Sequence, residues 1–189
     1  MSAAPDGAAP GRQLPIALAG FMGVGKSAIG RAAAAALRRP FFDSDDVAEE
    51  QLGKEIVELF REGKEQLFRD TEEAVIADLL ELDPPAVLAL GGGALLRPRT
   101  LERLRSRALL VHLHLPWPIL EEVLPRLRRG RPLLENRSLE EIHELYLQRE
   151  AIYAECPITV ELHRDGVDNG SAALLAALAP YGVEAPAAP

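Results

Sequence analysis

A glycine-rich segment that ends in Lys-Ser limits the choice of fold more than any other part of the sequence. Residues 20–27 read Gly-Phe-Met-Gly-Val-Gly-Lys-Ser and fit the pattern G-x-x-x-x-G-K-[ST] at every fixed position. A short apolar run at residues 15–20 leads into this segment. An alanine-rich stretch of helical character, residues 26–39, follows its last glycine. This strand–loop–helix order predicts a phosphate-binding loop in an α/β protein.

The loop predicts the way in which phosphates are bound. Glycines allow the backbone to curl so that successive N–H groups point inward, and the helix that follows adds the partial positive charge of its N-terminus. We expect Lys26 to reach the β- and γ-phosphates of ATP and Ser27 to place its hydroxyl on Mg²⁺. The residues expected to contact ATP here are Gly23, Val24, Gly25, Lys26, Ser27 and Ala28.

Short apolar runs alternate with longer amphipathic segments along the rest of the chain. This alternation predicts a three-layer α/β/α domain over residues 14–180, with a five-stranded parallel sheet covered by helices on both faces. Flexible tails are expected at residues 1–13 and 182–189, which are rich in Ala and Pro. The remaining strands are expected at residues 41–43, 86–90, 108–115 and 158–162.

Composition excludes several classes of function. The net charge of −8 argues against a nucleic-acid binder, and no apolar run reaches the ~18–20 residues that span a bilayer. The single cysteine, Cys156, rules out an internal disulfide and suits a reducing cytoplasm, where we expect it to pack rather than react. Residues 1–13 lack the apolar core of a signal peptide. We expect a monomer, because no heptad or long exposed apolar seam is visible.

Acidic residues follow the second predicted strand, as Asp43-Ser44-Asp45-Asp46. Strand ends in a parallel sheet face the same edge, so these carboxylates are expected near the phosphate loop. Two carboxylates one residue apart on an extended chain point the same way. One carboxylate can then serve the metal while the other faces a substrate hydroxyl. The alternative is that Asp43 or Asp46 caps a helix that begins near Val47.

Five blocks in this order resemble the shikimate kinase family, and the resemblance covers nearly the whole chain from Leu14 to Leu178. The first block is the phosphate loop, which is already specific alone, and the others are weak singly but specific together. The blocks are GFMGVGKS at 20–27, FFDSD at 41–45, FRDTE at 68–72, GGGA at 91–94, and RPLL at 131–134 followed by Arg149-x-x-x-Tyr153.

The resemblance implies a P-loop kinase of the nucleoside-monophosphate-kinase-like fold. It would transfer the γ-phosphoryl group of MgATP to a hydroxyl of shikimate, giving shikimate 3-phosphate and ADP in aromatic amino-acid biosynthesis. Arg69 and Arg149 would clamp the substrate carboxylate, and Asp45 would hold the reacting hydroxyl and orient or accept its proton. Asp43 would hold Mg²⁺ through water. The backbone of Gly91, Gly92 and Gly93 would close over the ring.

The resemblance also implies a mobile lid around residues 124–137. Arg131 would enter the site on this lid and stabilise the transferring phosphoryl group. Where the family often has an arginine against adenine, this chain has Leu124, so Arg126 or Arg128 is expected to stand in.

Several alternatives stay open at this stage. A kinase for another polyol acid such as gluconate would also use two arginines, and a binding domain that has lost catalysis would keep the fold. Adenylate kinase and GTPase motifs are missing from the sequence. Arg69 and Glu72, at i and i+3, could be only a surface pair. His112 and His114 share one face of a strand, but no third metal ligand is evident, so we expect core or surface histidines.

Overall fold

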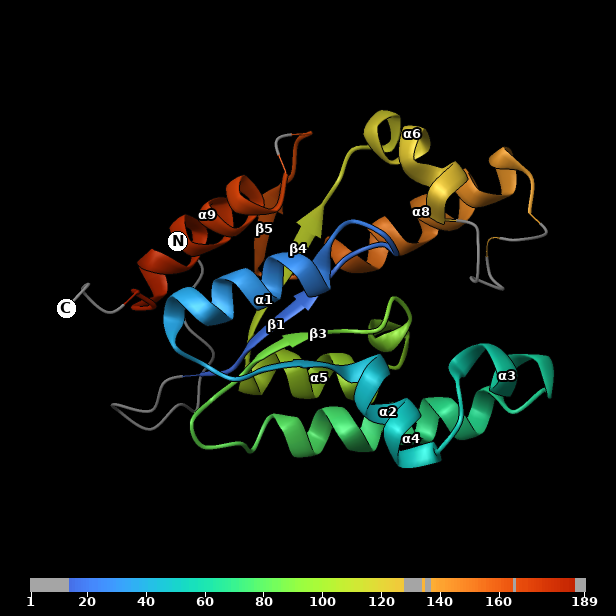
Figure 1. The fold of residues 1–189 in the computed structure, drawn as a ribbon, viewed down its shortest axis with the longest axis horizontal. Coiled ribbons are helices and arrows are strands. Elements are labelled where there is room, and N and C mark those ends of the chain that lie inside the picture. The colour runs from blue at the N-terminus through green and yellow to red at the C-terminus, as the bar shows by residue number, and fades with distance from the viewer. Residues whose placement is uncertain (1–13, 128–133, 135–136, 165, 186–189) are drawn as a thin grey trace.

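The computed structural model describes residues 14–127, 134, 137–164 and 166–185, and its centre is a parallel sheet of five strands (Figure 1). The strand order is β2-β3-β1-β4-β5, and all neighbouring strands are parallel, which confirms the five-stranded parallel sheet that the sequence predicted. The strands are β1 (Ile16–Ala19), β2 (Phe41–Asp43), β3 (Val87–Ala89), β4 (Leu109–His114) and β5 (Ile158–Glu161).

Helices cover both faces of this sheet. Figure 1 shows α1 and α9 together on one face and α4 and α5 on the other, which gives the three predicted layers. The helices are α1 (Lys26–Leu37), α2 (Ser44–Leu52), α3 (Ile56–Arg61), α4 (Glu65–Leu79), α5 (Pro98–Arg107), α6 (Trp117–Leu127), α8 (Leu139–Tyr153) and α9 (Gly166–Leu178), with short 3₁₀ turns at Ala94–Leu96 and Ala179–Tyr181.

The burial of the strands explains the apolar runs in the sequence. Every residue of β1 and β3 is buried, as expected where helices cover both faces of a parallel sheet. The edge strand β5 alternates buried and exposed residues instead. The alanine-rich α1 packs closely on the sheet: a Cβ at Gly30 would lie 2.8 Å from the ring of Phe41 and 2.9 Å from Leu18.

Strand order also positions the functional loops. The chain leaves β1 for the outer strand β2, returns to β3, and then passes by α5 to β4 on the other side of β1. The carboxyl ends of β1 and β3 therefore lie where the strand order reverses, which is the usual ligand-binding crevice of open parallel sheets. The phosphate loop follows β1 and the glycine triplet follows β3, so both meet at this crevice.

Two further expectations concern the chain ends and membranes. Val183 lies in the segment predicted as a flexible tail, yet it is buried in the core. The predicted tail at residues 1–13 lies outside the described residues. None of the helices in the described part of the chain is long and apolar enough to cross a bilayer.

Candidate active site

The phosphate loop connects β1 to α1 with a backbone that only glycine adopts easily. Gly23 and Gly25 have φ of +85° and +98°, and Gly25 forms the N-cap of α1. Lys26, at the first position of the helix, donates hydrogen bonds from Nζ to the carbonyl oxygens of Gly20 (2.8 Å) and Phe21 (3.2 Å). The Lys26 amine and the N-terminus of α1 therefore both lie at the phosphate loop, as the motif predicts.

Ser27 and Asp43 join this loop to the end of β2. The Ser27 Oγ donates to Asp43 Oδ2 at 2.5 Å. A hydroxyl and a carboxylate oxygen, half-buried beside a phosphate loop, are the donor types that Mg²⁺ takes in nucleotide sites. The two residues predicted to hold the metal are thus brought together, and their donor set fits that ion.

Asp45 occupies a different local structure from the one expected. Helix α2 begins at Ser44, and the side chain of Asp43 is its N-cap, with Oδ1 accepting from the Asp45 N–H at 3.1 Å. The prediction that Asp43 and Asp45 lie on one extended segment is wrong, because the cap turns the chain into the helix directly after β2. The alternative of a helix cap is thus confirmed for Asp43, whereas a cap by Asp46 on a helix that begins near Val47 is wrong, because α2 begins at Ser44.

The surroundings of Asp45 suit a proton acceptor. Its carboxyl is buried, and Oδ1 has no hydrogen-bond partner among the described residues. Burial raises its pKa to about 7, with the charges of Glu72 and Asp43 acting in the same direction and Lys26 and Arg69 opposing them. Perturbed carboxyls in a cleft are typical of catalytic sites.

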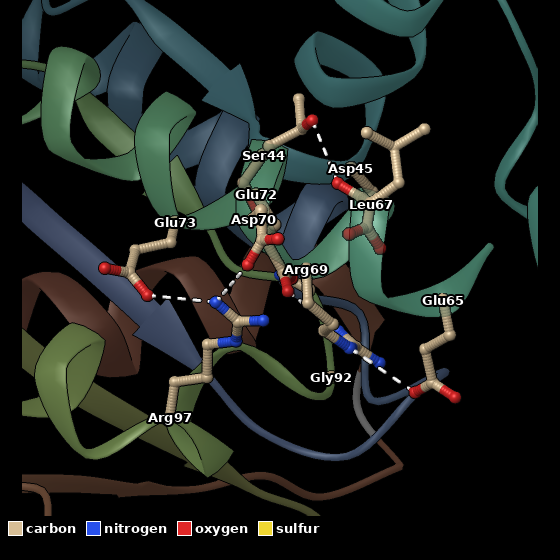
Figure 2. A network of polar contacts seen from close by, with 12 residues as sticks. Ser44, Asp45, Glu65, Leu67, Arg69, Asp70, Glu72, Glu73, Gly92 and Arg97 are labelled. Atoms are coloured by element: carbon tan, nitrogen blue, oxygen red, sulfur yellow. Dashed lines mark hydrogen bonds and ion pairs between the residues drawn. The ribbon is translucent and has the colours of Figure 1, made fainter.

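Arg69 and Glu72, both on α4, form the buried part of the polar network shown in Figure 2. Arg69 Nη1 donates to Glu72 Oε2 at 2.7 Å, and the two side chains are only 13% and 3% exposed. The alternative of a surface pair is therefore wrong. Burial raises the pKa of Glu72, against the opposing charge of Arg69. The Arg69 guanidinium also lies over the rings of Phe60 (5.6 Å) and Phe68 (4.9 Å).

A second arginine, Arg97, contacts acidic side chains of α4. Its Nη1 lies 2.7 Å from Asp70 Oδ1 and 3.2 Å from Glu73 Oε2, so it ties the start of α5 to α4 (Figure 2). Arg69 lines the cleft described below, whereas Arg97 is not among its lining residues. Arg97 thus fixes the helix that carries Arg69.

The glycine triplet lets charged side chains approach the backbone after β3. A Cβ at Gly91 would overlap the carboxylates of Glu72 and Asp45, and one at Gly93 would lie 2.7 Å from Arg69 Nη1. The Gly91 N–H donates to Ser44 Oγ at 2.9 Å, which joins the ends of β3 and β2. At Gly91 and Gly93 the missing side chain thus makes room for the site's own residues, in addition to the expected room for a ligand.

Arg149 and Tyr153 approach the same place from α8. Arg149 Nη1 is buried and has no hydrogen-bond partner in the described part of the chain, and burial lowers the Arg149 pKa. Tyr153, one turn further on, donates from its hydroxyl to the Gly92 carbonyl at 2.8 Å. Tyr153 belongs to one of the motifs in the sequence, but neither Tyr153 nor Ser44 was predicted to have a role. Both contact the glycine triplet, which is distant in sequence.

One cleft of about 600 Å³ brings most of the predicted residues together. Its wall also includes apolar residues that were not predicted as site residues: Ile56, Val57, Phe60, Phe68, Leu90 and Leu127. The predicted residues in its wall are Gly23, Gly25, Lys26, Ser27, Ala28, Asp43, Asp45, Arg69, Gly92, Gly93 and Arg149. Gly91 lies behind the wall, beside Glu72, and Val24 is buried and lines a neighbouring cavity.

The predicted lid residues are only partly described. Arg131 and Arg128 lie outside the described residues, as does the side chain of Arg126. Leu124, at the position where the family often has an arginine, is 2% exposed and belongs to the core. The assignments of Arg126 and Arg131 to ATP therefore remain predictions.

Comparisons with known proteins point to one family. A family model described as shikimate kinase matches residues 22–177. The chain is 38% identical over 148 residues to a shikimate kinase of Geobacillus thermodenitrificans, covering 78% of this chain and 79% of that protein. It is 43% identical over 149 residues to one of Paracidovorax citrulli, covering 77% and 80%.

Solved structures of shikimate kinases are also similar to this chain. A shikimate kinase from Acinetobacter baumannii in complex with shikimate matches with a TM-score of 0.81 and 32% identity, covering 92% of this chain and 97% of that one. The enzyme from Aquifex aeolicus matches with a TM-score of 0.77 and 31% identity, covering 90% and 99%. A gluconokinase from Sinorhizobium meliloti, at 16% identity and a TM-score of 0.55, shares the fold.

Proposed function

The chain belongs to the shikimate kinase family, and from this premise we propose how its own residues transfer the γ-phosphoryl group of MgATP to a hydroxyl of shikimate. The products are shikimate 3-phosphate and ADP. One observation carries the proposal: a phosphate loop, the half-buried carboxyl of Asp45 and two half-buried arginines, Arg69 and Arg149, line one cleft.

The phosphate loop forms the nucleotide end of this cleft. Backbone N–H groups and the N-terminus of α1 receive the phosphates, and Lys26 turns from the loop carbonyls toward the β- and γ-phosphates. Ser27 and Asp43 would hold Mg²⁺. When bound, this ion neutralises charge on the phosphate oxygens.

The two arginines form the acid end. Arg149 directs its unpaired Nη1 to the shikimate carboxylate, and Arg69, fixed by Glu72, supplies a second guanidinium. Phe60 and Phe68 keep the Arg69 plane in place and form an apolar wall for the ring. The backbone at Gly92 and Gly93 closes the opposite side.

Asp45 lies between these two ends. Its charge environment includes both Lys26 at the nucleotide end and Arg69 at the acid end. Its Oδ1 accepts the proton of the reacting hydroxyl while that oxygen attacks the γ-phosphorus and the bond to the ADP oxygen breaks. Arg131, on the predicted lid, stabilises the charge of the transferring group, and closure of the lid excludes water.

A kinase for another polyol acid is the second candidate. Two arginines suit any carboxylate, and the gluconokinase similarity supports the fold alone. Family membership favours shikimate. The binding-domain alternative is disfavoured because Lys26, Ser27, Asp43 and Asp45 are present and correctly grouped. We further propose a cytoplasmic monomer, from the single buried cysteine and the absence of a heptad pattern in the sequence.

The test is ADP release from MgATP in the presence of shikimate, gluconate or AMP, measured in parallel. Turnover with shikimate alone is expected. Turnover with gluconate but not shikimate would overturn the substrate and keep the kinase. No turnover with any acceptor, despite tight ATP binding, would support the binding-domain alternative.

A further inference from the structure

Three potential metal ligands meet at the carboxyl end of β4, outside the wall of the cleft. His112 and His114 lie on β4, and Glu150 reaches them from α8. The sequence predicted core or surface histidines because no third ligand was evident. Glu150 is 36 residues from His114 and approaches only because α8 packs beside β4, so the pattern of the chain could not reveal it.

The three ligand atoms are close enough to share one ion. His114 Nδ1 lies 2.7 Å from Glu150 Oε2, and His112 Nε2 lies 3.3 Å from Glu150 Oε1. One atom from each residue can be chosen so that all three lie within 4.8 Å of one another. Ligands of a tetrahedral Zn²⁺, bound at about 2.0–2.1 Å, are separated by roughly 3.3–3.4 Å. The 2.7 Å contact is shorter than this spacing, so His114 and Glu150 would move apart when an ion binds.

His112 gives independent evidence for a ligand at this place. The residue is 3% exposed, and its Nε2 is a buried nitrogen without a hydrogen-bond partner among the described residues. Glu150 Oε1 lies 3.3 Å from this nitrogen and forms an ion pair with it only when the ring is protonated. A buried polar atom without a hydrogen bond lowers the stability of the folded protein, so its presence calls for an explanation. A metal ion bound at Nε2 would satisfy it.

The surroundings also suit an ion. The side chains of His114 and Glu150 are 24% and 18% exposed, which leaves a path from solvent. Glu161 on β5 places Oε2 3.7 Å from the other ring nitrogen of His114. A carboxylate behind a ligating histidine commonly orients the ring and raises its basicity.

We propose that His112, His114 and Glu150 bind a divalent transition-metal ion, with Zn²⁺ as the best match. Two imidazole nitrogens and one carboxylate oxygen are a common three-ligand zinc set with an open fourth position. Mg²⁺ prefers oxygen ligands and octahedral geometry, so this site is chemically distinct from the pair Ser27 and Asp43.

The position of the site gives the ion a consequence for the rest of the molecule. Glu150 adjoins Arg149 and lies one turn before Tyr153, which contacts the Gly92 carbonyl. An ion bound by residues of both β4 and α8 would fix the position of α8, the helix that carries Arg149, which is predicted to bind the substrate carboxylate. Zn²⁺ is therefore expected to stabilise the fold as well as to bind.

The test uses untagged, chelator-treated protein and two probes, Zn²⁺ alone and Co²⁺ alone, both in excess Mg²⁺. Calorimetry with Zn²⁺ is expected to show one ion per chain, and Co²⁺ the visible absorption of a low-symmetry, near-tetrahedral site. At a free Zn²⁺ concentration about 100-fold above Kd, Tm is expected to rise by roughly 5–10 °C. Absence of saturable binding by either ion would overturn the proposal.

Matched variants locate the site. Glu150→Gln and His114→Asn are expected to weaken Zn²⁺ binding at least about 100-fold, because loss of supporting groups alone costs 10–100-fold. His163→Asn removes an exposed histidine outside the cluster and is expected to leave Kd unchanged. Circular dichroism of the metal-free variants establishes that they fold. Equal Zn²⁺ affinity in folded Glu150→Gln and wild type would contradict the assignment.

Discussion

The nucleotide end of the cleft is formed by one short stretch of chain, residues 20–27, and mainly by its backbone. The acid end is assembled from the side chains of Arg69 on α4 and Arg149 on α8, which are far apart in sequence, and Asp45 on α2 lies at the junction of the two ends. Binding at the nucleotide end therefore depends on the conformation of the loop, whereas binding at the acid end depends on how the buried charges are paired. Changes at one end should therefore leave binding at the other end nearly intact.

The two arginines of the acid end differ in the same way. Arg69 is fixed by Glu72 at 2.7 Å and by two aromatic rings. Arg149 Nη1 has no hydrogen-bond partner in the described part of the chain. Arg69 is thus pre-positioned by the protein, whereas Arg149 offers an unpaired donor to the substrate.

The largest effect is expected for Asp45→Asn, at the junction of the two ends. The amide cannot accept the hydroxyl proton, so kcat should fall by about 10²–10⁴. Equilibrium binding of MgADP and of shikimate should change little, because neither the loop nor the arginines are altered. Steady-state kinetics and calorimetry measure the two quantities. A near wild-type kcat would show that another group takes the proton.

Arg69→Ala should affect only the acid end. A hydrogen bond to a charged group contributes about 1.5–3 kcal/mol, so the KM for shikimate should rise roughly 10–150-fold. The KM for ATP should not change. The melting temperature should also fall, because Glu72 is left buried without its partner. An unchanged KM for shikimate, in a protein that folds, would remove Arg69 from the acid site.

Gly93→Ala tests whether the triplet acts through Arg69. The added Cβ would lie 2.7 Å from Arg69 Nη1 and should push the guanidinium aside, raising the KM for shikimate less than Arg69→Ala does. In the Arg69→Ala background the same change should have little further effect, because the clash is absent. Additive effects in this double-mutant cycle would mean that Gly93 acts on the ligand directly.

The smallest effect is expected for Ser44→Ala. This change leaves the buried Gly91 N–H without the Ser44 Oγ acceptor and should cost about 1–3 kcal/mol of stability. Tm should then fall by roughly 2–4 °C per kcal/mol. Kinetic constants for both substrates should move less than in Gly93→Ala. A large selective rise in the KM for shikimate, with Tm unchanged, would give Ser44 a direct role.

Prediction from the sequence succeeded best where structure is local. The phosphate loop, the five parallel strands and the helices around them follow from short motifs and buried apolar runs. The pairing of Asp43 with Ser27 also followed, since both lie at strand or helix ends on one edge of the sheet.

The sequence could not show what depends on packing between distant segments. The N-cap by Asp43 is a local contact, which the sequence offered only as the alternative to an extended chain at Asp45. The contact of Tyr153 with Gly92 and the approach of Glu150 to His112 both require α8 to lie at the end of the sheet. No local pattern encodes these contacts.

The independence of the two ends can be measured by calorimetry of the Arg149→Ala variant, with shikimate and MgADP titrated separately into the variant and the wild type. We expect shikimate binding to weaken at least about tenfold through loss of a charged hydrogen bond, with MgADP binding unchanged. Equal weakening of both ligands in a folded variant would contradict a cleft with separate nucleotide and acid ends.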